Sequence, residues 1–301
     1  MLVNFKEMFK KAKAEKRAIG AFNFTTLEQL KAIIDAGNEK EYPCILATSE
    51  SAINYMGLEN IVFLVKNLTQ NSKTEFVLHL DHGKNFEICK QCIDAGYTSV
   101  MIDASYLPFE ENINETSKVV NYAKKFNVSV EAELGKLQGI EDEVVSSENI
   151  YTNPKEALEF IKRTGIDSLA ISIGTSHGAY KFKGESKLNI ALLKEIDTIT
   201  NHFPLVLHGA SSLNDNLLKN FFNAGGELKN AKGVDENNLK QAIEYGICKI
   251  NVDTDLRIAF TTGVRESLKQ ASTFNLRDYL TNGIQKMKLE VINRIELFKN
   301  K

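Results

Sequence analysis

The chain alternates short β-type runs with amphipathic helical stretches along nearly its whole length. The strand candidates are residues 19–24, 44–49, 76–80, 99–103, 128–133, 168–173, 204–208 and 248–252. Apolar residues at helical spacing lie between them, for example at 26–40, 58–70, 110–126, 154–163 and 190–201. This alternation predicts parallel strands joined by helices, in either a closed (β/α)8 barrel or an open, doubly wound sheet.

Polar residues at the ends of the strand candidates decide between these two folds. They are Asn23, Ser49, Asp81, His82, Asp103, Glu133, His208, Asn251 and Asp253, and His177 follows the sixth run. A barrel brings the carboxyl ends of all eight strands around one mouth, whereas an open sheet would leave many of these residues far apart. We therefore expect a single TIM-barrel domain over residues 1–301. Residues 225–246 are interpreted as an elaborated connection, and residues 273–301 as two further helices outside the barrel repeat.

Composition excludes several classes of protein. The 301 residues are 43% hydrophobic and 25% charged, as in an ordinary soluble globular protein. A net charge of −2 gives no electrostatic footprint for nucleic acid, and no apolar run is long enough for a membrane span. The N-terminus resembles an amphipathic helix and lacks the features of a signal peptide, so we expect a cytoplasmic protein.

The Cys89-Lys90-Gln91-Cys92 spacing falls on one face of a predicted helix, which favours core packing over redox chemistry.

Three histidines recur in the same topological setting. His82, His177 and His208 each lie where a β-type run breaks into glycine. Three imidazoles at strand ends satisfy a catalytic zinc site, because three protein ligands leave a fourth position for substrate. Asp81, next to one of these ligands, could be the acid–base partner. The other two histidines are expected to be structural: His79 as a buried, hydrogen-bonded support and His202 as an exposed turn residue.

Further carboxylates and glycine-rich turns surround this predicted mouth. Asp103 and Glu133, with Glu131 two residues before it, could hydrogen-bond the imidazole N–H groups, and Glu133 could also ligate the metal; both roles stay open. Turns rich in glycine and hydroxyl groups follow the sixth and seventh runs, a region where barrels often bind phosphate. Lys181 lies just downstream and could neutralise a phosphate.

Five motifs together resemble class II, zinc-dependent fructose-1,6-bisphosphate aldolases, and are most similar to the bacterial class IIB branch. They are Asp81-His82-Gly83, Val130-Glu131-Ala132-Glu133-Leu134-Gly135, Gly174-Thr175-Ser176-His177-Gly178, His208-Gly209-Ala210-Ser211 and Asn251-Val252-Asp253-Thr254-Asp255-Leu256-Arg257. The resemblance runs in order from Ala21-Phe22-Asn23 to the terminal helices. It implies a glycolytic lyase that cleaves fructose 1,6-bisphosphate to dihydroxyacetone phosphate and glyceraldehyde 3-phosphate through a zinc-stabilised enediolate.

The resemblance also implies a role for each matching residue. Zinc would be held by His82, His177 and His208. Asp81 would handle the proton on the C4 oxygen, and Glu141, on a loop that follows Gly139, would handle the C1 proton. Residues implied for substrate binding are Asn23, Ser49, Gly178, Lys181, Gly209, Ser211, Asn251, Asp253, Thr254 and Arg257. Arg257 would meet the distal phosphate, in some assemblies from a neighbouring subunit. A monovalent cation (Na⁺ or K⁺) near the phosphate and a homodimer or homotetramer are further implications.

Three rival functions stay open. Tagatose-1,6-bisphosphate aldolases share the metal site, but tend to lose the acidic residue and the arginine that this chain keeps as Asp253 and Arg257. A Schiff-base aldolase needs a buried lysine, for which Lys249 is the candidate, but it would leave the histidines idle. Non-catalytic barrel subunits also occur among the relatives, and such a subunit should lack ligands.

Overall fold

The structure is a computed structural model that describes residues 1–136, 138–141, 144–146, 150–177, 188–228, 233–270 and 272–300, with the backbone alone for 138–141, 144–146 and 176–177. Eight parallel strands form a closed barrel in the order β1-β11-β10-β8-β5-β4-β3-β2. They are β1 (Ile19–Asn23), β2 (Cys44–Thr48), β3 (Phe76–Gly83), β4 (Ser99–Ile102), β5 (Ser129–Leu134), β8 (Ser168–Ile171), β10 (Leu205–Leu207) and β11 (Ile247–Val252). The predicted barrel is confirmed.

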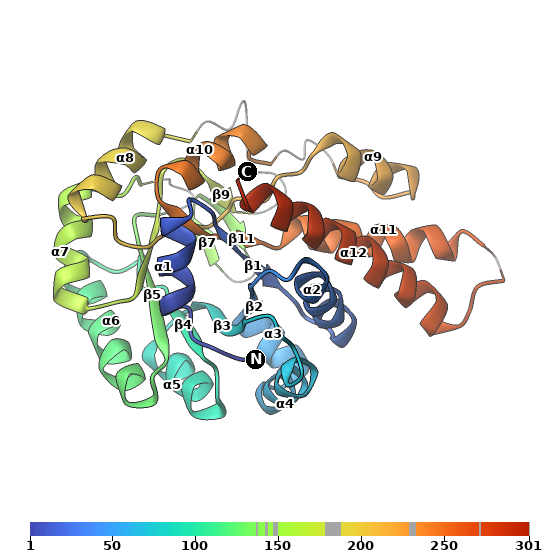
Figure 1. Cartoon of the computed structure of the whole chain (residues 1–301), viewed down its shortest axis with the longest axis horizontal. Helices are drawn as coiled ribbons and strands as arrows, with labels where there is room; N and C mark the ends of the chain where they lie inside the picture. Colours follow the sequence, from blue (N-terminus) through green and yellow to red (C-terminus); the bar gives the residue numbers. More distant parts are fainter. Residues whose placement is uncertain are drawn as a thin grey trace.

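Helices surround the barrel, as Figure 1 shows. They are α1 (Lys6–Ala14), α2 (Leu27–Lys40), α3 (Glu50–Met56), α4 (Leu58–Thr69), α5 (Phe86–Ala95), α6 (Phe109–Ala123) with the 3₁₀ turn η1 (Lys124–Phe126), α7 (Pro154–Thr164), α8 (Ile190–Ile199), α9 (Asp215–Asn223), α10 (Glu236–Glu244), α11 (Thr254–Leu268) and α12 (Leu276–Phe298). Side chains cap the N-termini of several of these helices. Asn153, for example, accepts hydrogen bonds from the backbone N–H groups of Lys155 (2.9 Å) and Glu156 (3.3 Å) ahead of α7.

The amino-terminal helix packs at the bottom of the barrel, away from the predicted mouth. The N–H of Phe5 donates to the Ser129 hydroxyl at the start of β5, and the Phe5 ring lies 6.4 Å from that of His79. Phe5 and Phe9 are both buried, so the apolar face of this amphipathic segment covers the amino ends of the strands. All four cysteines are free and buried, and burial raises the pKa of the Cys92 thiol to about 12. This agrees with core packing of the Cys89 and Cys92 pair.

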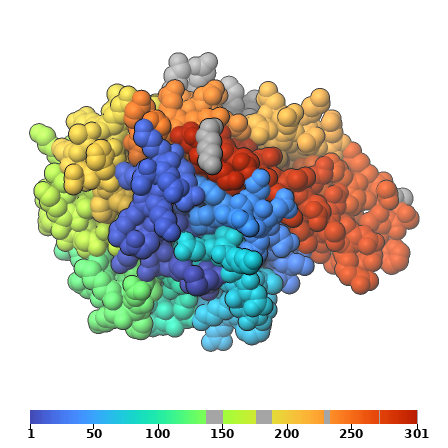
Figure 2. Space-filling view, viewed as in Figure 1, coloured from blue at the N-terminus to red at the C-terminus, as the bar shows by residue number. Residues whose placement is uncertain are grey.

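The carboxy-terminal segment differs from its prediction. Two helices were expected over residues 273–301, but the described part of this range, residues 273–300, contains one continuous helix, α12. Gly263 of α11 and Gly283 of α12 let the two helices approach closely, since a Cβ at Gly263 would lie 2.5 Å from the Asn282 carbonyl oxygen. Tertiary packing therefore keeps α12 continuous across Gly283, although glycine has a low helix propensity. The two helices form an arm that projects from the barrel in Figures 1 and 2.

A small second sheet was also not foreseen. It has the order β7-β6-β9 and consists of β6 (Gln138–Glu141), β7 (Val144–Ser146) and β9 (Ser176–His177). The segment around Glu141 was expected to be a loop, yet Glu141 ends β6. His177 pairs with Gly139 of β6, so this sheet places the segment of the predicted proton carrier beside that of a predicted ligand. Within the residues that the structure describes, no helix is long and apolar enough to cross a membrane.

Candidate active site

The end of β3 carries the adjacent residues Asp81 and His82 into the mouth of the barrel together. His82 has a left-handed backbone with φ of 50°, and the pairing of β3 with β4 shifts register between Leu80 and Gly83. In a regular strand, neighbouring side chains would point to opposite faces. The bulge lets both side chains approach His208 instead. Gly83 packs tightly below them, because a Cβ there would lie 2.7 Å from the Met101 carbonyl oxygen.

Two imidazole rings form the centre of the site. His82 and His208 have ring centroids 4.5 Å apart in an edge-on arrangement, and both side chains are buried. Ligand atoms of Asp81, His82 and His208 lie within 4.8 Å of one another, a grouping able to hold a metal ion. A second such grouping joins His82 to Asp103 and Glu133. Both groupings come from the carboxyl ends of barrel strands, as predicted.

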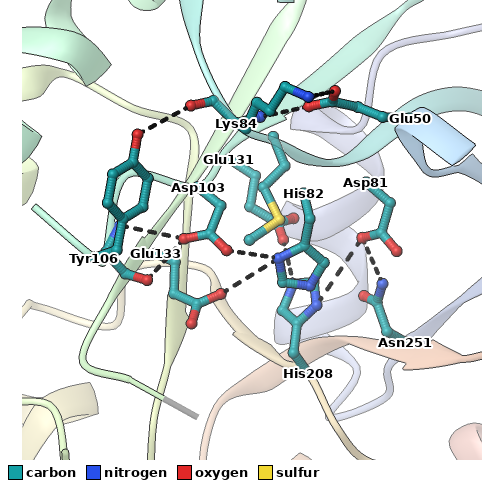
Figure 3. A network of polar contacts seen from close by, with 12 residues as sticks. Glu50, Asp81, His82, Lys84, Asp103, Tyr106, Glu131, Glu133, His208 and Asn251 are labelled. Carbon is teal, nitrogen blue, oxygen red and sulfur yellow. Dashed lines mark hydrogen bonds and ion pairs between the residues drawn. The ribbon is translucent and has the colours of Figure 1, made fainter. Parts of the chain in front are cut away.

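Carboxylates orient the two rings through opposite nitrogens. Nδ1 of His82 donates to Oδ2 of Asp103 at 2.8 Å, whereas Nε2 of His208 donates to Oε1 of Glu131 at 2.8 Å. Glu133 is farther away, with Oε2 3.9 Å from Nδ1 of His82. Figure 3 shows Asp103 and Glu133 on one side of His82, and Asp81 with Asn251 on the other. Each carboxylate therefore fixes one nitrogen of its ring, and a metal ion would be bound through the other nitrogen.

Electrostatics around these rings follow from burial and from the nearby charges. Burial opposes ionisation of Asp103, but the hydrogen bond from His82 outweighs it and holds the pKa of Asp103 well below its usual range. Burial also opposes ionisation of Glu131, and here the Lys249 charge and the His208 hydrogen bond lower the pKa. Burial and the nearby His82 lower the pKa of His208, so its ring is neutral, the form in which imidazole binds metals.

Two amides hold the carboxylate of Asp81. Nδ2 of Asn23, from the end of β1, donates to Oδ2, and Nδ2 of Asn251, from β11, donates to Oδ1, each at 2.8 Å. Oδ1 also lies 4.0 Å from Nδ1 of His208. The carboxylate thus has a fixed orientation beside the histidine pair.

Other predicted site residues lie around the same mouth. Ser49 follows β2, where its hydroxyl caps α3 by accepting from the Ala52 N–H. Gly209 follows β10 with φ of 59°, a left-handed conformation that favours glycine. Ser211 is buried two residues later.

The start of α11 contributes another set of predicted residues. Asp253 and Thr254 lie where this helix begins, and Asp253 accepts from Nε of the half-exposed Arg257 at 2.8 Å. His177 and Glu141 are described by backbone alone, and Gly178 and Lys181 fall outside the described residues.

Two contributors were not recognised as such from the sequence. Asp255 is fully buried in the first turn of α11 and accepts the Ser212 N–H at 3.2 Å, which ties the Gly209–Ser212 turn to that helix. Lys249 was weighed only as a Schiff-base nucleophile, but its Nζ lies 2.8 Å from both carboxylate oxygens of Glu131. An inward lysine and an inward glutamate on two predicted barrel strands were a signal of this pair, because buried charges need partners.

The predicted supporting role of His79 agrees with the geometry. Its Nδ1 lies 2.7 Å from the Ser99 hydroxyl, and its Nε2 accepts from the Lys249 ammonium at 3.2 Å. Burial, then the Lys249 charge, lowers the pKa of His79 to about 3, so the ring is neutral. His202 is exposed and hydrogen-bonds to Asp197 at 2.6 Å.

A closed barrel whose mouth holds a buried histidine pair, oriented by carboxylates and flanked by a clamped aspartate, defines a metal-dependent barrel enzyme. Sequence comparison narrows this class. Residues 3–301 match the family described as fructose-bisphosphate aldolase class-II. The chain belongs to this family, and the predicted enzyme class, a lyase that depends on zinc, is confirmed at that level.

Individual relatives are similar over full length. The fructose-bisphosphate aldolase of Helicobacter pylori strain 26695 is 48% identical, with 99% of this chain and 98% of that protein covered. The enzyme of the same name from Thermus caldophilus is 45% identical, with 99% and 98% covered. Among solved structures, the YdjI aldolase of Escherichia coli K12 superposes with a TM-score of 0.80 at 29% identity, covering 99% of this chain and 97% of that one.

Proposed function

We propose that this chain cleaves fructose 1,6-bisphosphate reversibly to dihydroxyacetone phosphate and glyceraldehyde 3-phosphate in glycolysis and gluconeogenesis. The observation that carries the proposal is the Asp81 carboxylate, clamped by Asn23 and Asn251 beside the buried His82–His208 pair. This arrangement offers a metal-binding pair and an oriented acid–base group on the same side of the mouth. The full-length match to the aldolase family supports the same reaction.

The donor set fits a zinc ion. Nδ1 of His208 is buried and has no hydrogen-bond partner among the described side chains, although imidazole nitrogens in such a setting need one. His82 and His208 would hold the ion together with His177, whose segment is at the mouth in β9. Zn²⁺ bound there would act as a Lewis acid, supplying positive charge where negative charge develops on the substrate. Asp103 and Glu131 would fix the ring orientations, and Glu133 would be a further support or an alternate ligand.

Asp81 is assigned the proton on the C4 oxygen of the substrate. Cleavage of the bond between C3 and C4 requires loss of the C4 hydroxyl proton, and condensation requires its return. The amides of Asn23 and Asn251 each donate to one Asp81 oxygen, and this orients the carboxylate beside the histidine pair, where the substrate hydroxyl would lie. Asn23 would orient that hydroxyl with Ser49, and Glu141 would deliver and remove the proton at C1.

The phosphate groups are assigned to the loops after β10 and β11. Gly209, Ser211, Asn251, Asp253 and Thr254 would bind dihydroxyacetone phosphate together with Gly178, Lys181 and a monovalent cation, Na⁺ or K⁺. The left-handed Gly209 and the N-terminus of α11 support this assignment, because exposed N–H groups at such positions bind anions. Arg257 would bind the distal phosphate.

Tagatose 1,6-bisphosphate is the competing substrate, since it differs only at C4. The Asp253–Arg257 pair on α11 favours fructose, in line with the sequence argument. The test is to measure kcat/KM for both ketose bisphosphates with the zinc-loaded enzyme. A clear preference for the fructose epimer supports the proposal, whereas an equal or reversed ratio would transfer the assignment to the tagatose enzyme.

We propose further that the chain acts as one domain in a cytoplasmic homo-oligomer, either a dimer or a tetramer. The apolar surface of the α11–α12 arm supports association, because Phe274 is 90% exposed and Leu276 is 61% exposed at its tip. Light scattering should give the mass of two or four chains for the wild type. A smaller mass for Phe274→Ser would support this interface, while a monomeric wild type would contradict association.

A further inference from the structure

A charged pair is buried in the barrel interior beneath the histidines. Lys249 on β11 and Glu131 on β5 are both fully buried, and the Lys249 ammonium contacts both carboxylate oxygens at 2.8 Å. Aliphatic side chains normally fill this region of a TIM barrel. A buried ion pair is a poor source of stability, because desolvation offsets most of its attraction. Its presence therefore calls for another explanation.

The pair continues directly into the proposed metal site. Oε1 of Glu131 accepts from Nε2 of His208 at 2.8 Å. This hydrogen bond requires the ring proton to be on Nε2, so the lone pair of Nδ1 points away from Glu131. His82 has the opposite arrangement, because Asp103 binds its Nδ1. Which nitrogen of His208 carries the proton, and which is left to bind the metal, thus depends on a carboxylate that lies inside the barrel.

The remaining contacts hold the carboxylate in place. The ammonium has only donors, so Nε2 of His79 must accept from it at 3.2 Å, and Nδ1 of His79 then donates to Ser99. The Ser168 hydroxyl lies 3.5 Å from Oε2 of Glu131. Lys249 thus contacts Glu131 and His79, and it shares Oε1 of Glu131 with His208.

We propose that Lys249 and Glu131 are positioning residues that set the tautomer of His208 and direct its Nδ1 to the metal. Glu131 supplies the acceptor for Nε2–H, and Lys249 neutralises and orients that acceptor. This inference rests on the proposed zinc site, and it gives Lys249 a role that requires no covalent bond to the substrate.

Two double variants isolate the acceptor while keeping the barrel interior neutral. Glu131→Gln/Lys249→Met retains a carbonyl oxygen that can face Nε2 of His208, and Glu131→Met/Lys249→Met removes it. Replacement of a buried ion pair by neutral groups of similar size is tolerated in other proteins. The zinc affinity of each is measured by competition with a chromophoric chelator, starting from the zinc-loaded protein, and the ligand geometry by the visible spectrum after Co²⁺ substitution.

The Gln variant should bind zinc within about tenfold of the wild type, and the Met variant should bind it about 10–100-fold more weakly with an altered Co²⁺ spectrum. Equal zinc affinity of the two variants would overturn the inference. If the Met variant does not fold, the Gln variant decides alone. Near-normal affinity then supports the inference, and a loss as large as that of His208→Ala overturns it.

Lys13→Met is the matched control, because Lys13 of α1 forms a largely buried ion pair with Asp197 (2.8 Å), away from His82 and His208. This variant should leave zinc affinity unchanged. Zinc affinity and the Co²⁺ spectrum are both measured without substrate. A wild type that binds zinc but cleaves no ketose bisphosphate would therefore contradict the proposed function and leave this inference standing.

Discussion

Asp81 and His82 are consecutive in the chain, yet both side chains lie beside His208, because His82 has a φ of 50° at a bulge in β3. One strand end thereby supplies a metal-ligand candidate and an acid–base candidate. A left-handed backbone at a residue other than glycine carries strain, which is typical of functional sites.

Asp81→Ala should separate acid–base chemistry from metal binding. The variant should retain zinc while kcat falls by about 10²-fold or more, because the proton on the C4 oxygen loses its acceptor. Steady-state kinetics and metal analysis of the same preparation check both parts. If zinc is lost along with activity, Asp81 is a ligand and its assignment is wrong.

Asp103→Ala is the counterpart of that variant. Asp103 contacts His82 at 2.8 Å, so its loss should weaken zinc binding by about 10–100-fold. Activity should recover in part when zinc is added in excess. Unchanged zinc affinity would mean that the ring of His82 is held by other contacts, with Glu133 at 3.9 Å the nearest candidate.

Much of this architecture could be predicted from the sequence. Each barrel strand is an apolar run that ends in polar residues or glycine. The position of the strand and the residues at its carboxyl end can therefore be predicted from the local sequence pattern. Tertiary details could not be predicted in this way. The bulge at His82 depends on pairing with β4, and the unbroken α12 depends on close packing between Gly263 and Gly283.

Long-range polar contacts were likewise beyond the local pattern. Sequence placed Asp103, Glu131 and Glu133 at the mouth as a group, without showing which carboxylate meets which imidazole. The pairing of Glu131 with both His208 and Lys249 joins three strands that are far apart in the chain. The β6–β9 sheet also forms only when distant segments meet, which is why the Glu141 segment was taken for a loop.

Glu141→Ala should slow exchange of the C1 proton of dihydroxyacetone phosphate with solvent. Glu141 ends β6, the strand that pairs with the His177 segment, so its backbone lies at the edge of the proposed site. Zinc should stay bound. NMR detection of deuterium incorporation measures the exchange directly, and an unchanged rate would move the role to Glu143 or Asp142.

Arg257→Ala should impair cleavage of the bisphosphate substrate without abolishing the binding of dihydroxyacetone phosphate. Arg257 is half exposed and paired with Asp253, and a guanidinium can bind phosphate through two hydrogen bonds. We expect kcat/KM for fructose 1,6-bisphosphate to fall by about 10–10³-fold, with dihydroxyacetone phosphate still bound.

Arg163→Ala is the control for Arg257, because Arg163 on α7 pairs with Glu110 on the outer surface. It should leave kcat/KM unchanged. An equal loss in the two variants, or loss of triose binding in Arg257→Ala, would show that Arg257 has no specific role at the distal phosphate.

Removal and return of the metal tests the central claim most directly. Zinc should be stripped by chelation, its absence verified by elemental analysis, and cleavage of fructose 1,6-bisphosphate measured before and after Zn²⁺ or Co²⁺ is added. We predict about one zinc per chain, loss of activity on removal and recovery on addition. Full activity in the verified metal-free protein, or trapping of substrate on Lys249 by borohydride, would contradict the account.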